Sequence, residues 1–440
     1  MAQMVRDGLL DLPGELAALM PKITALPSYF RAEVLFKIAQ GLEKDSEAFA
    51  RLITQEVKKP LKESRREVGR AAFTFRWACE EAKRFGGELL PLDLDANSEG
   101  RMALTRRFPR GPALFITPFN FPLNLVAHKV AAAIAVGVPF ALKPAPAASK
   151  TAQKLGELIR ASGWPEAAMA VVSVSNEQAE ALARDDRFGV LSFTGSATVG
   201  WHLKSIAGKK HVILELGGNA GVLVASDGDL AWAASRCAWG AYYYSGQVCI
   251  SVQRIVVEAR VYDEFKDLLL KNIAELKIGD PMDENTDIAP LISEDAAKRV
   301  ESWIDEAVKA GGKMLAGGKR EGALIAPTLI EDAPENAKIA CEEVFGPVAT
   351  LEKTDSRERG LDKVARSAYG LQAGLFTNDM NLVFRAWQKL PVGGLIVNDI
   401  PSFRSDAMPY GGVKDSGTGR EGVRYAMQEL TELRTLVLKP

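Results

Sequence analysis

The chain has 440 residues, of which 47% are hydrophobic and 25% charged, and its formal net charge is −1. This length exceeds what one hydrophobic core usually supports, so we expect two or three domains. The near-neutral charge argues against nucleic acid or an anionic membrane as the main partner, because both attract a basic excess. The partner is expected to be a small molecule.

Four cysteines are scattered along the chain, at positions 79, 237, 249 and 341. They are too few and too far apart for a disulfide framework, which indicates a reducing compartment. Residues 1–20 lack the basic start and small-residue cleavage site of a signal peptide. The longest apolar run, residues 130–142, is broken by a glycine and a proline and is too short to span a bilayer. We therefore expect a soluble, cytoplasmic protein.

Residues 29–85 carry apolar residues at steps of three and four, which predicts amphipathic helices that cover a larger core. The segment Gly100–Arg110 alternates polar and apolar residues and predicts one strand of a hairpin. That strand is either a solvated edge or a contact between subunits. The tail ELTELRTLVLK predicts a helix end that runs into an apolar strand, for which a partner subunit is a plausible pairing.

From Ala113 onwards, short apolar runs alternate with helical patterns, at ALFITPF, FALKP, MAVVSV and VLSFTGS. This alternation predicts an α/β fold with a parallel sheet buried on both faces, and a second α/β half follows Leu216. Ligands bind beyond the carboxyl ends of the strands in such sheets. The polar residues that follow these ends are Asn120, Lys143, Ser196 and Glu215.

Each of these residues has two interpretations. The turn from Gly195 to Gly200 opens a helix and can present backbone N–H groups to a phosphate, or Ser196 simply caps that helix. Glu215 is either an acid that binds a ribose or a catalytic carboxylate. Lys143 either binds a ribose or phosphate or is a surface lysine. Asn120 either donates to an oxyanion or caps a turn.

Cys249 lies in the run Tyr242–Arg254, YYYSGQVCISVQR. No second Cys or His stands at ligand spacing, so no metal site is predicted. A catalytic thiol needs a group that lowers its pKa or takes its proton, and Glu215 is the candidate. The alternative is a small buried apolar residue. The three histidines, at positions 128, 202 and 211, have no spacing typical of zinc or a triad and are expected to be structural or exposed to solvent.

Together, these motifs resemble the aldehyde dehydrogenase superfamily from about residue 31 to the C-terminus, through PFNFP, LKPAP, FTGSATVG, ELGGN, GQVCIS, EEVFGP and MPYGGVKDSGTGREG in that order. The similarity is to members of the lactaldehyde and non-phosphorylating glyceraldehyde-3-phosphate dehydrogenase type. It implies a Rossmann-like cofactor domain (1–99 and 110–215), an α/β catalytic domain (216–422) and a small β flap for oligomerisation (100–109 and 423–440). A homodimer or homotetramer is expected.

The resemblance also implies roles for individual residues. Cys249 would attack an aldehyde, Asn120 and the backbone N–H of Cys249 would hold the oxyanion, and Glu215 would activate water as general base. Pro146 stands where NAD-preferring relatives often carry a glutamate, so either NAD or NADP is expected, with Ser149 and Lys150 near the 2′-phosphate. The cofactor would contact Thr117, Phe119, Lys143, Gly195, Ser196, Glu343 and Phe345.

The loop Asn398–Arg404 corresponds to the family's stretch that borders the aldehyde pocket. We expect Arg404 to select a small polar or anionic aldehyde, with Tyr242 or Tyr243 lining the pocket; the alternative for Arg404 is a surface ion pair. Relatives that acylate coenzyme A lack the glutamate at position 215, so hydrolysis to the free acid is predicted. The other possible functions are a coenzyme A-acylating aldehyde dehydrogenase and a non-catalytic protein on the same fold.

Overall fold

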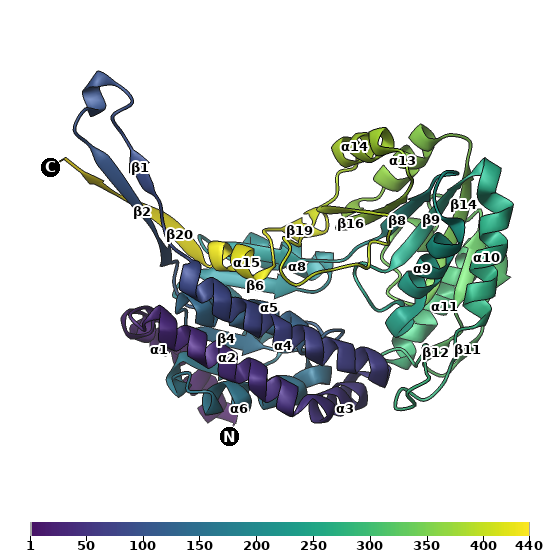
Figure 1. Cartoon of the computed structure of the whole chain (residues 1–440). Coiled ribbons are helices and arrows are strands. Elements are labelled where there is room, and N and C mark those ends of the chain that lie inside the picture. Colours follow the sequence, from purple (N-terminus) through teal and green to yellow (C-terminus); the bar gives the residue numbers. More distant parts are fainter. Residues whose placement is uncertain (1, 440) are drawn as a thin grey trace.

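The structure, a computed structural model, describes the backbone of residues 2–439 and the side chains of residues 11–439. The terminal residues of the predicted domains, 1 and 440, lie outside the described residues. The chain forms two α/β halves, and a thin flap projects away from them (Figure 1). Each half is built on a mainly parallel sheet, so the predicted α/β class is confirmed.

Four helices begin the chain; the last three lie within residues 28–84, where the apolar periodicity predicts amphipathic helices, and the first was not predicted. In α2 the buried residues include Val34, Leu35, Ile38 and Leu42, which form one apolar stripe along the helix. This stripe packs against the fourth helix, which also packs against the first helix of the sheet that follows. The bounds are α1 Ala2–Thr24, α2 Ser28–Lys44, α3 Ser46–Val57 and α4 Leu61–Arg84.

The first half contains a six-stranded sheet in the order β19-β7-β6-β3-β4-β5. Its strands are parallel except the short β19, and all residues of β3, β4 and β6 are buried. The bounds are β3 Ala113–Ile116, α5 Asn124–Val136, β4 Phe140–Lys143, α6 Ser149–Ala161, β5 Met169–Val171, α7 Asn176–Arg184, β6 Val190–Thr194, α8 Ala197–Ile206, β7 His211–Glu215 and β19 Gly417–Thr418. The carboxyl ends of β7, β6, β3 and β4 are therefore neighbours, which places Glu215, Ser196, Asn120 and Lys143 along one edge.

The second half contains a seven-stranded sheet in the order β10-β13-β14-β9-β8-β16-β17, in which only β10 is antiparallel. Its strands are β8 Ala220–Val224, β9 Val252–Glu258, β10 Lys313–Ala316, β13 Thr328–Glu331, β14 Val348–Thr354, β16 Gln372–Phe376 and β17 Gly394–Val397. Its helices are α9 Leu230–Tyr242, α10 Tyr262–Ala274, α11 Glu294–Lys309, α12 Lys338–Cys341, α13 Arg357–Ala365 and α14 Met380–Lys389.

The flap is a three-stranded antiparallel sheet of β1 (Leu89–Pro91), β2 (Met102–Pro109) and β20 (Thr431–Leu438). The predicted strand at 100–110 thus pairs with both a hairpin partner and the C-terminal tail. The assignment of 423–429 to an oligomerisation strand is wrong, because these residues form α15 (Val423–Glu429). Its residues Val423, Ala426 and Met427 recur at helical spacing and are buried against α5 and α4.

Short elements complete the described chain. They are the ribbons β11 Arg320–Glu321 with β12 Leu324–Ile325 and β15 Tyr369–Gly370 with β18 Val413–Lys414, and the 3₁₀ turns η1 Ala96–Ser98, η2 Pro146–Ala148, η3 Glu166–Ala168, η4 Tyr243–Gly246 and η5 Ala259–Val261. Within residues 2–439, no helix is long and apolar enough to cross a membrane.

Candidate active site

A cleft of about 330 Å³ lies beyond the carboxyl ends of β3, β6 and β7, and residues of both α/β halves line it. It brings together eight of the predicted site residues: Phe119, Asn120, Gly195, Ser196, Glu215, Cys249, Glu343 and Phe345. The other two predicted cofactor residues lie at the ends of adjacent strands, where the N–H of Thr117 donates to the carbonyl of Lys143 at 3.1 Å. Topology, and not sequence proximity, assembles this group.

Cys249 follows a turn in a strained backbone conformation. Tyr244 and Ser245 have positive φ values of 49° and 53°, which cost about 1–3 kcal/mol per residue. Hydrogen bonds hold the turn: the Ser245 hydroxyl donates to Ala289 O at 2.6 Å. Gly246 continues the left-handed run, and a Cβ there would lie 2.0 Å from Gly346 O. The turn therefore fixes the approach of Cys249 to the cleft.

The Cys249 side chain is partly exposed to the cleft. Burial raises the pKa of this thiol to about 12, while a hydrogen bond from Tyr410 acts in the opposite direction. A group with such a pKa is protonated at neutral pH, so its activation depends on its neighbours.

Asn120 is held close to the turn at Tyr243–Gly246 that precedes Cys249, which we call the nucleophile turn. Its Nδ2 donates to Gln247 O at 3.1 Å, which uses one of the two amide hydrogens. Its Oδ1 is buried without a partner, and the residue is almost fully buried. The second amide hydrogen could donate to the oxyanion that forms on a carbonyl oxygen when the Cys249 sulfur attacks the carbonyl carbon.

Glu215 ends β7 and is buried at the cleft, where neither carboxylate oxygen has a hydrogen-bond partner among the described residues. Burial, followed by the charge of Glu421, raises the pKa of Glu215 well above its usual value, and Arg404 and Lys129 offset this in part. Nothing in the described chain uses its two oxygens, so they are available to a water molecule or a substrate.

The two glycines after Glu215 allow close packing at the cleft. A Cβ on Gly217 would lie 2.4 Å from Glu343 Oε2, and one on Gly218 would lie 2.1 Å from Cys249 O. The N–H of Gly218 also donates to Glu343 Oε1 at 3.0 Å. The Leu-Gly-Gly-Asn run is thus required for Glu343 and Cys249 to reach this position.

The remaining cleft residues form a polar and aromatic lining suited to a nucleotide. Ser196 precedes α8, and its side chain makes no capping hydrogen bond, contrary to the capping alternative. Phe119 and Phe345 meet edge to face with centroids 5.9 Å apart. Burial raises the pKa of Glu343 to about 7, although the Gly218 N–H opposes this. Arg299 of α11 also lines the cleft, and no sequence motif pointed to it.

A second cavity of about 190 Å³, which we call the arginine cavity, lies next to the nucleophile turn. Its wall carries four arginines against two glutamates. Phe121, one residue after Asn120, and Tyr243 contribute to it, and Tyr243 stacks on Trp239 with centroids 4.2 Å apart. The lining comprises Glu63, Arg66, Glu67, Arg70, Phe121, Arg236, Trp239, Tyr243, Ser402, Phe403 and Arg404.

The three residues predicted to contact the substrate do not lie together in the structure. Arg404 and Tyr243 line the arginine cavity. The prediction for Tyr242 is wrong: its ring is fully buried in the core of the second half, and its hydroxyl donates to Thr328 O at 3.0 Å. Arg404 is not the surface residue of the alternative interpretation, because only 6% of its side chain is exposed; it pairs with Glu421 at 3.0 Å.

Asp406 connects several of these groups, and sequence reasoning missed it. It accepts two hydrogen bonds from Arg70, of 3.0 and 2.7 Å, and one from His128 Nε2 at 2.8 Å. Arg404 Nε lies 3.9 Å from the same carboxylate. Although burial opposes it, His128 and Arg70 hold the pKa of Asp406 well below its usual range. One carboxylate thus positions two guanidinium groups of the arginine cavity.

Lys129 and Glu421 were also missed. They form a buried pair at 3.1 Å, and Lys129 also donates to Ser192 Oγ at 2.7 Å. Although burial opposes it, Lys129 and Arg404 lower the pKa of Glu421 to about 2, so this carboxylate is ionised. Glu421 lies in the matched run MPYGGVKDSGTGREG, which was the only sequence signal for it.

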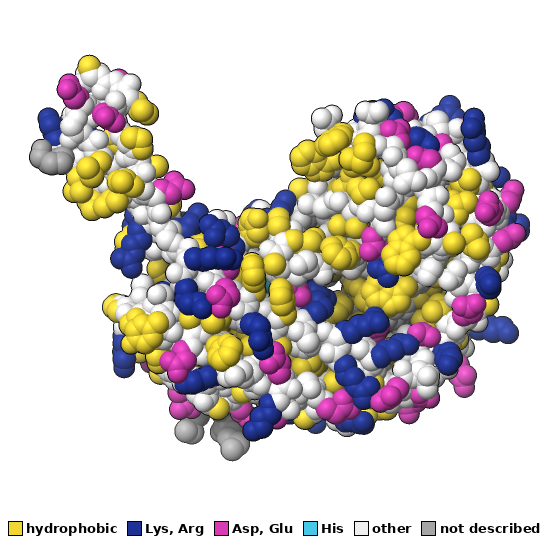
Figure 2. All heavy atoms as spheres, in the orientation of Figure 1, with side chains coloured by type: hydrophobic (Ala, Val, Ile, Leu, Met, Phe, Trp, Pro, Cys, Tyr) yellow, Lys and Arg dark blue, Asp and Glu magenta, His cyan; other side chains and the backbone are white. Residues whose placement is uncertain are grey.

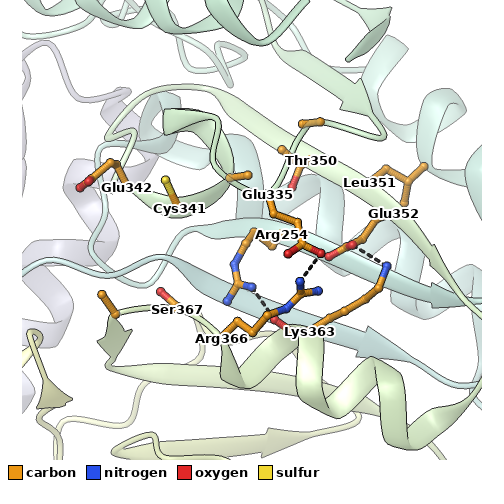
Figure 3. Close-up of a pocket in the computed structure, with 13 residues that line it drawn as sticks. Arg254, Glu335, Cys341, Glu342, Thr350, Leu351, Glu352, Lys363, Arg366 and Ser367 are labelled. Carbon is orange, nitrogen blue, oxygen red and sulfur yellow. Dashed lines mark hydrogen bonds and ion pairs between the residues drawn. The ribbon is translucent and has the colours of Figure 1, made fainter. Parts of the chain in front are cut away.

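A larger cavity of about 410 Å³ lies in the second half (Figure 3), and Cys249 is not among the residues that line it. Most of its charged groups already have partners: Lys363 donates to Glu352 at 2.7 Å, Arg366 pairs with Glu335, and Arg254 donates to carbonyls at the end of α13. Figure 3 shows the pairs Lys363–Glu352 and Arg366–Glu335 in contact. With most of its charges satisfied internally, this cavity is a weaker candidate site than the cleft.

The side chains of residues 11–439 contain no group of three or more His, Cys, Asp or Glu residues placed to hold a metal ion.

Comparison with known proteins shows the family of the chain. The aldehyde dehydrogenase family model matches residues 17–436. The 3-sulfolactaldehyde dehydrogenase of Priestia aryabhattai is 45% identical over 411 residues, which are 93% of this chain and 86% of that protein. The chain therefore belongs to the aldehyde dehydrogenase family.

Two solved structures are similar over nearly the whole chain. Aldehyde dehydrogenase 21 from Physcomitrella patens, in complex with the reaction product succinate, has a TM-score of 0.96 and 45% identity and covers 97% of this chain and 89% of its own. Glyceraldehyde-3-phosphate dehydrogenase GapN from Methanocaldococcus jannaschii, complexed with NADP, has a TM-score of 0.95 and 35% identity and covers 99% and 95%.

Proposed function

We propose that the protein oxidises a short anionic aldehyde to its carboxylic acid with NAD+ or NADP+. The observation that carries the proposal is the joint placement of Cys249, Asn120 and Glu215 in one cleft, next to a cavity walled by four arginines. The three cleft residues supply the chemistry of aldehyde oxidation, and the arginine cavity selects the charge of the substrate.

The three cleft residues divide the reaction between them. Cys249 attacks the carbonyl carbon as a thiolate, and the Asn120 amide and the Cys249 N–H hold the resulting oxyanion of the thiohemiacetal. When NAD(P)+ is bound, it supplies the acceptor for the hydride whose loss leaves a thioester on Cys249. Glu215 then takes a proton from water, which attacks the thioester and releases the acid and the thiolate. Burial of Glu215 supports this role, since a raised pKa makes a carboxylate a stronger base at neutral pH.

The cleft suits the cofactor in the chemistry of its donors and acceptors. Lys143 and Ser196, with the N-terminus of α8, would hold the ribose and phosphates, and Glu343 would accept from a ribose hydroxyl. Thr117 offers a buried hydroxyl without a partner beside Lys143. The M. jannaschii enzyme was solved in complex with NADP. In this chain the third residue after Lys143 is Pro146, an uncharged side chain that does not repel a 2′-phosphate.

The charge of the arginine cavity supports an anionic substrate. Arg404 is almost fully buried, yet its Nε has no hydrogen-bond partner among the described side chains. Asp406 holds Arg70 beside it. A carboxylate, phosphate or sulfonate can accept from such groups. Two related proteins are named for anionic aldehydes, 3-sulfolactaldehyde and glyceraldehyde 3-phosphate, and a third was solved with the anionic product succinate, while others are named for uncharged lactaldehyde.

The test is a comparison of kcat/KM for 3-sulfolactaldehyde, glyceraldehyde 3-phosphate, lactaldehyde and hexanal with both cofactors. The proposal predicts that the anionic aldehydes exceed hexanal by at least about tenfold. A preference for hexanal would contradict it. The same assay, with and without coenzyme A, separates hydrolysis from acyl transfer, since a hydrolytic enzyme turns over steadily without that acceptor.

We further propose that the flap joins copies of this chain into a homodimer or homotetramer. Exposed apolar residues lie on both β2 and β20, and more lie on α14, where 68% of Trp387 is exposed. Figure 2 shows apolar side chains on the projecting flap and on the outer surface of the second half. Contiguous apolar surfaces of this kind are typical of protein interfaces.

Two further expectations stay predictions. They are the division into a cofactor domain (1–99, 110–215) and a catalytic domain (216–422), and a cytoplasmic location, with which the four free cysteines are consistent.

A further inference from the structure

Tyr410 contacts the nucleophile directly. Its hydroxyl lies 3.2 Å from Cys249 Sγ, which is a hydrogen-bond distance for sulfur. The residue is 3% exposed, and no other described group forms a hydrogen bond to this hydroxyl. A buried phenol is normally paired with a strong acceptor, so its placement on a thiol requires an explanation.

The protonation states determine the direction of this hydrogen bond. Burial raises the pKa of Tyr410 well above its usual value, so the phenol keeps its proton at neutral pH. While Cys249 is a thiol, either group can donate across the 3.2 Å contact. Once Cys249 is a thiolate, the sulfur has no proton to give, so Tyr410 donates, and the bond is strongest in that state.

Arg404 lies on the face of the same ring, with its guanidinium carbon 3.7 Å from the ring centroid. A cation there draws electron density from the ring and makes the phenol a stronger hydrogen-bond donor. Glu421 holds the arrangement in place: its carboxylate accepts from Arg404 at 3.0 Å, and its backbone exchanges two hydrogen bonds with that of Tyr410, of 3.0 and 2.7 Å. The three residues thus form a closed set of contacts behind the sulfur.

We propose that Tyr410 is a further catalytic residue, whose hydroxyl stabilises the Cys249 thiolate by a hydrogen bond that Arg404 strengthens from the ring face. The inference rests on the proposed function of Cys249. No proton leaves Tyr410 in this role. The hydroxyl donates to the thiolate before attack, loses that partner when sulfur bonds to carbon, and regains it when the acid is released.

The test follows the reactivity of Cys249 in the absence of aldehyde. Inactivation of the full-length enzyme by iodoacetamide is measured from pH 6 to pH 10, and fragment mass spectrometry locates the modified cysteine. Iodoacetamide reacts with the thiolate and not the thiol, and it carries no charge of its own, so the inactivation rate reports the thiolate fraction. Tyr410→Phe keeps the ring and removes the donor. At each pH below the thiol pKa its inactivation rate should be about ten- to a hundredfold lower than that of wild type, the change in thiolate fraction expected for the loss of one hydrogen bond to a charged group.

Two further variants make the result specific. Tyr262→Phe removes another buried phenol, which donates to Glu331 at 2.9 Å far from the cleft, and should leave the profile unchanged. Arg404→Met keeps the Tyr410 hydroxyl but removes the cation, and should lower the inactivation rate as well. A Tyr410→Phe profile that superimposes on wild type, or an equal loss of rate in Tyr262→Phe, would overturn the proposal. Alkylation of Cys249 that leaves aldehyde oxidation intact would instead overturn the proposed function.

Discussion

Lys59 and Glu67 form an ion pair from which solvent is fully excluded. Glu67 also accepts the backbone N–H groups of Leu123 and Asn124 at 2.8 and 3.0 Å, and the Lys59 amine lies 3.6 Å from the centroid of the Phe121 ring. The pair thus holds the segment that follows Asn120, the predicted oxyanion donor. A contact remote from the reacting sulfur therefore supports the geometry of the site.

Breaking this pair should destabilise the protein strongly. Lys59→Met leaves the Glu67 carboxylate buried without its cation, which costs about 3–5 kcal/mol. Thermal unfolding should show a melting temperature several degrees below wild type, with reduced kcat. Lys59→Met combined with Glu67→Gln should recover part of the loss, because no charge is then left unpaired. Arg76→Met, which removes an exposed pair with Glu43, should cost no more than about 1 kcal/mol.

Substrate charge should be recognised by Arg70, which lines the arginine cavity and keeps 31% of its side chain exposed. Arg70→Met should lower kcat/KM for glyceraldehyde 3-phosphate by about tenfold or more, mainly through KM, and change that for hexanal little. Steady-state kinetics with both aldehydes measure the difference. Equal losses for the two substrates would mean that Arg70 acts only on the fold.

Cofactor binding should depend on pH through Glu343. Its pKa of about 7 lies above the usual 4.5 because of burial, so the group is largely neutral at pH 6 and ionised at pH 8. Only the ionised form is a full acceptor for a ribose hydroxyl, so the Kd for NAD(P)+ should fall several-fold as pH rises from 6 to 8. Fluorescence titration measures this Kd. Glu343→Gln should bind with little dependence on pH over that range, and a slope equal to wild type would exclude Glu343 as the titrating group.

Replacing exposed apolar residues of the flap by lysine should separate the copies of this chain. Leu433 and Leu436 are each 55% exposed on β20, so Leu433→Lys with Leu436→Lys is tolerated by the single chain. Light scattering after size exclusion should then show a smaller species than wild type. Tyr29→Lys, at an exposed position on α2, should leave the mass unchanged. A wild-type chain that is already monomeric would contradict the proposed role of the flap.

The sequence placed Asn120 and Glu215 at one edge of a sheet because they follow parallel strands, where topology alone brings residues together. Cys249 and Glu343 precede β9 and β14, so the resemblance to a family, and not topology, pointed to them. Arg70 on α4 and Asp406 in a turn are 336 residues apart and meet only through tertiary contact, so no local pattern pointed to them. Tyr410 lies in a recognised motif, but nothing in that motif shows that its hydroxyl reaches Cys249.

The three consecutive tyrosines before Cys249 show a different limit of prediction from sequence. The sequence offered Tyr242 and Tyr243 equally as pocket residues. Tyr242 ends α9 and is buried with that helix in the core of the second half, Tyr243 lies in the arginine cavity, and Tyr244 lies beneath Lys59. Neighbouring residues at the end of a helix point to different sides, and the sequence did not show which of the two tyrosines faces the core, which is why this assignment failed.

The most direct test traps the covalent intermediate. Glu215→Gln removes the proposed base for hydrolysis and keeps a side chain of nearly the same shape. Mixed with an anionic aldehyde and NADP+, this variant should release about one equivalent of NADPH per site in a rapid burst and then nearly stop, and peptide mass spectrometry of the quenched enzyme should find the acyl group on Cys249. Steady turnover by Glu215→Gln without coenzyme A, or a burst with no acyl group on Cys249, would contradict the proposed chemistry.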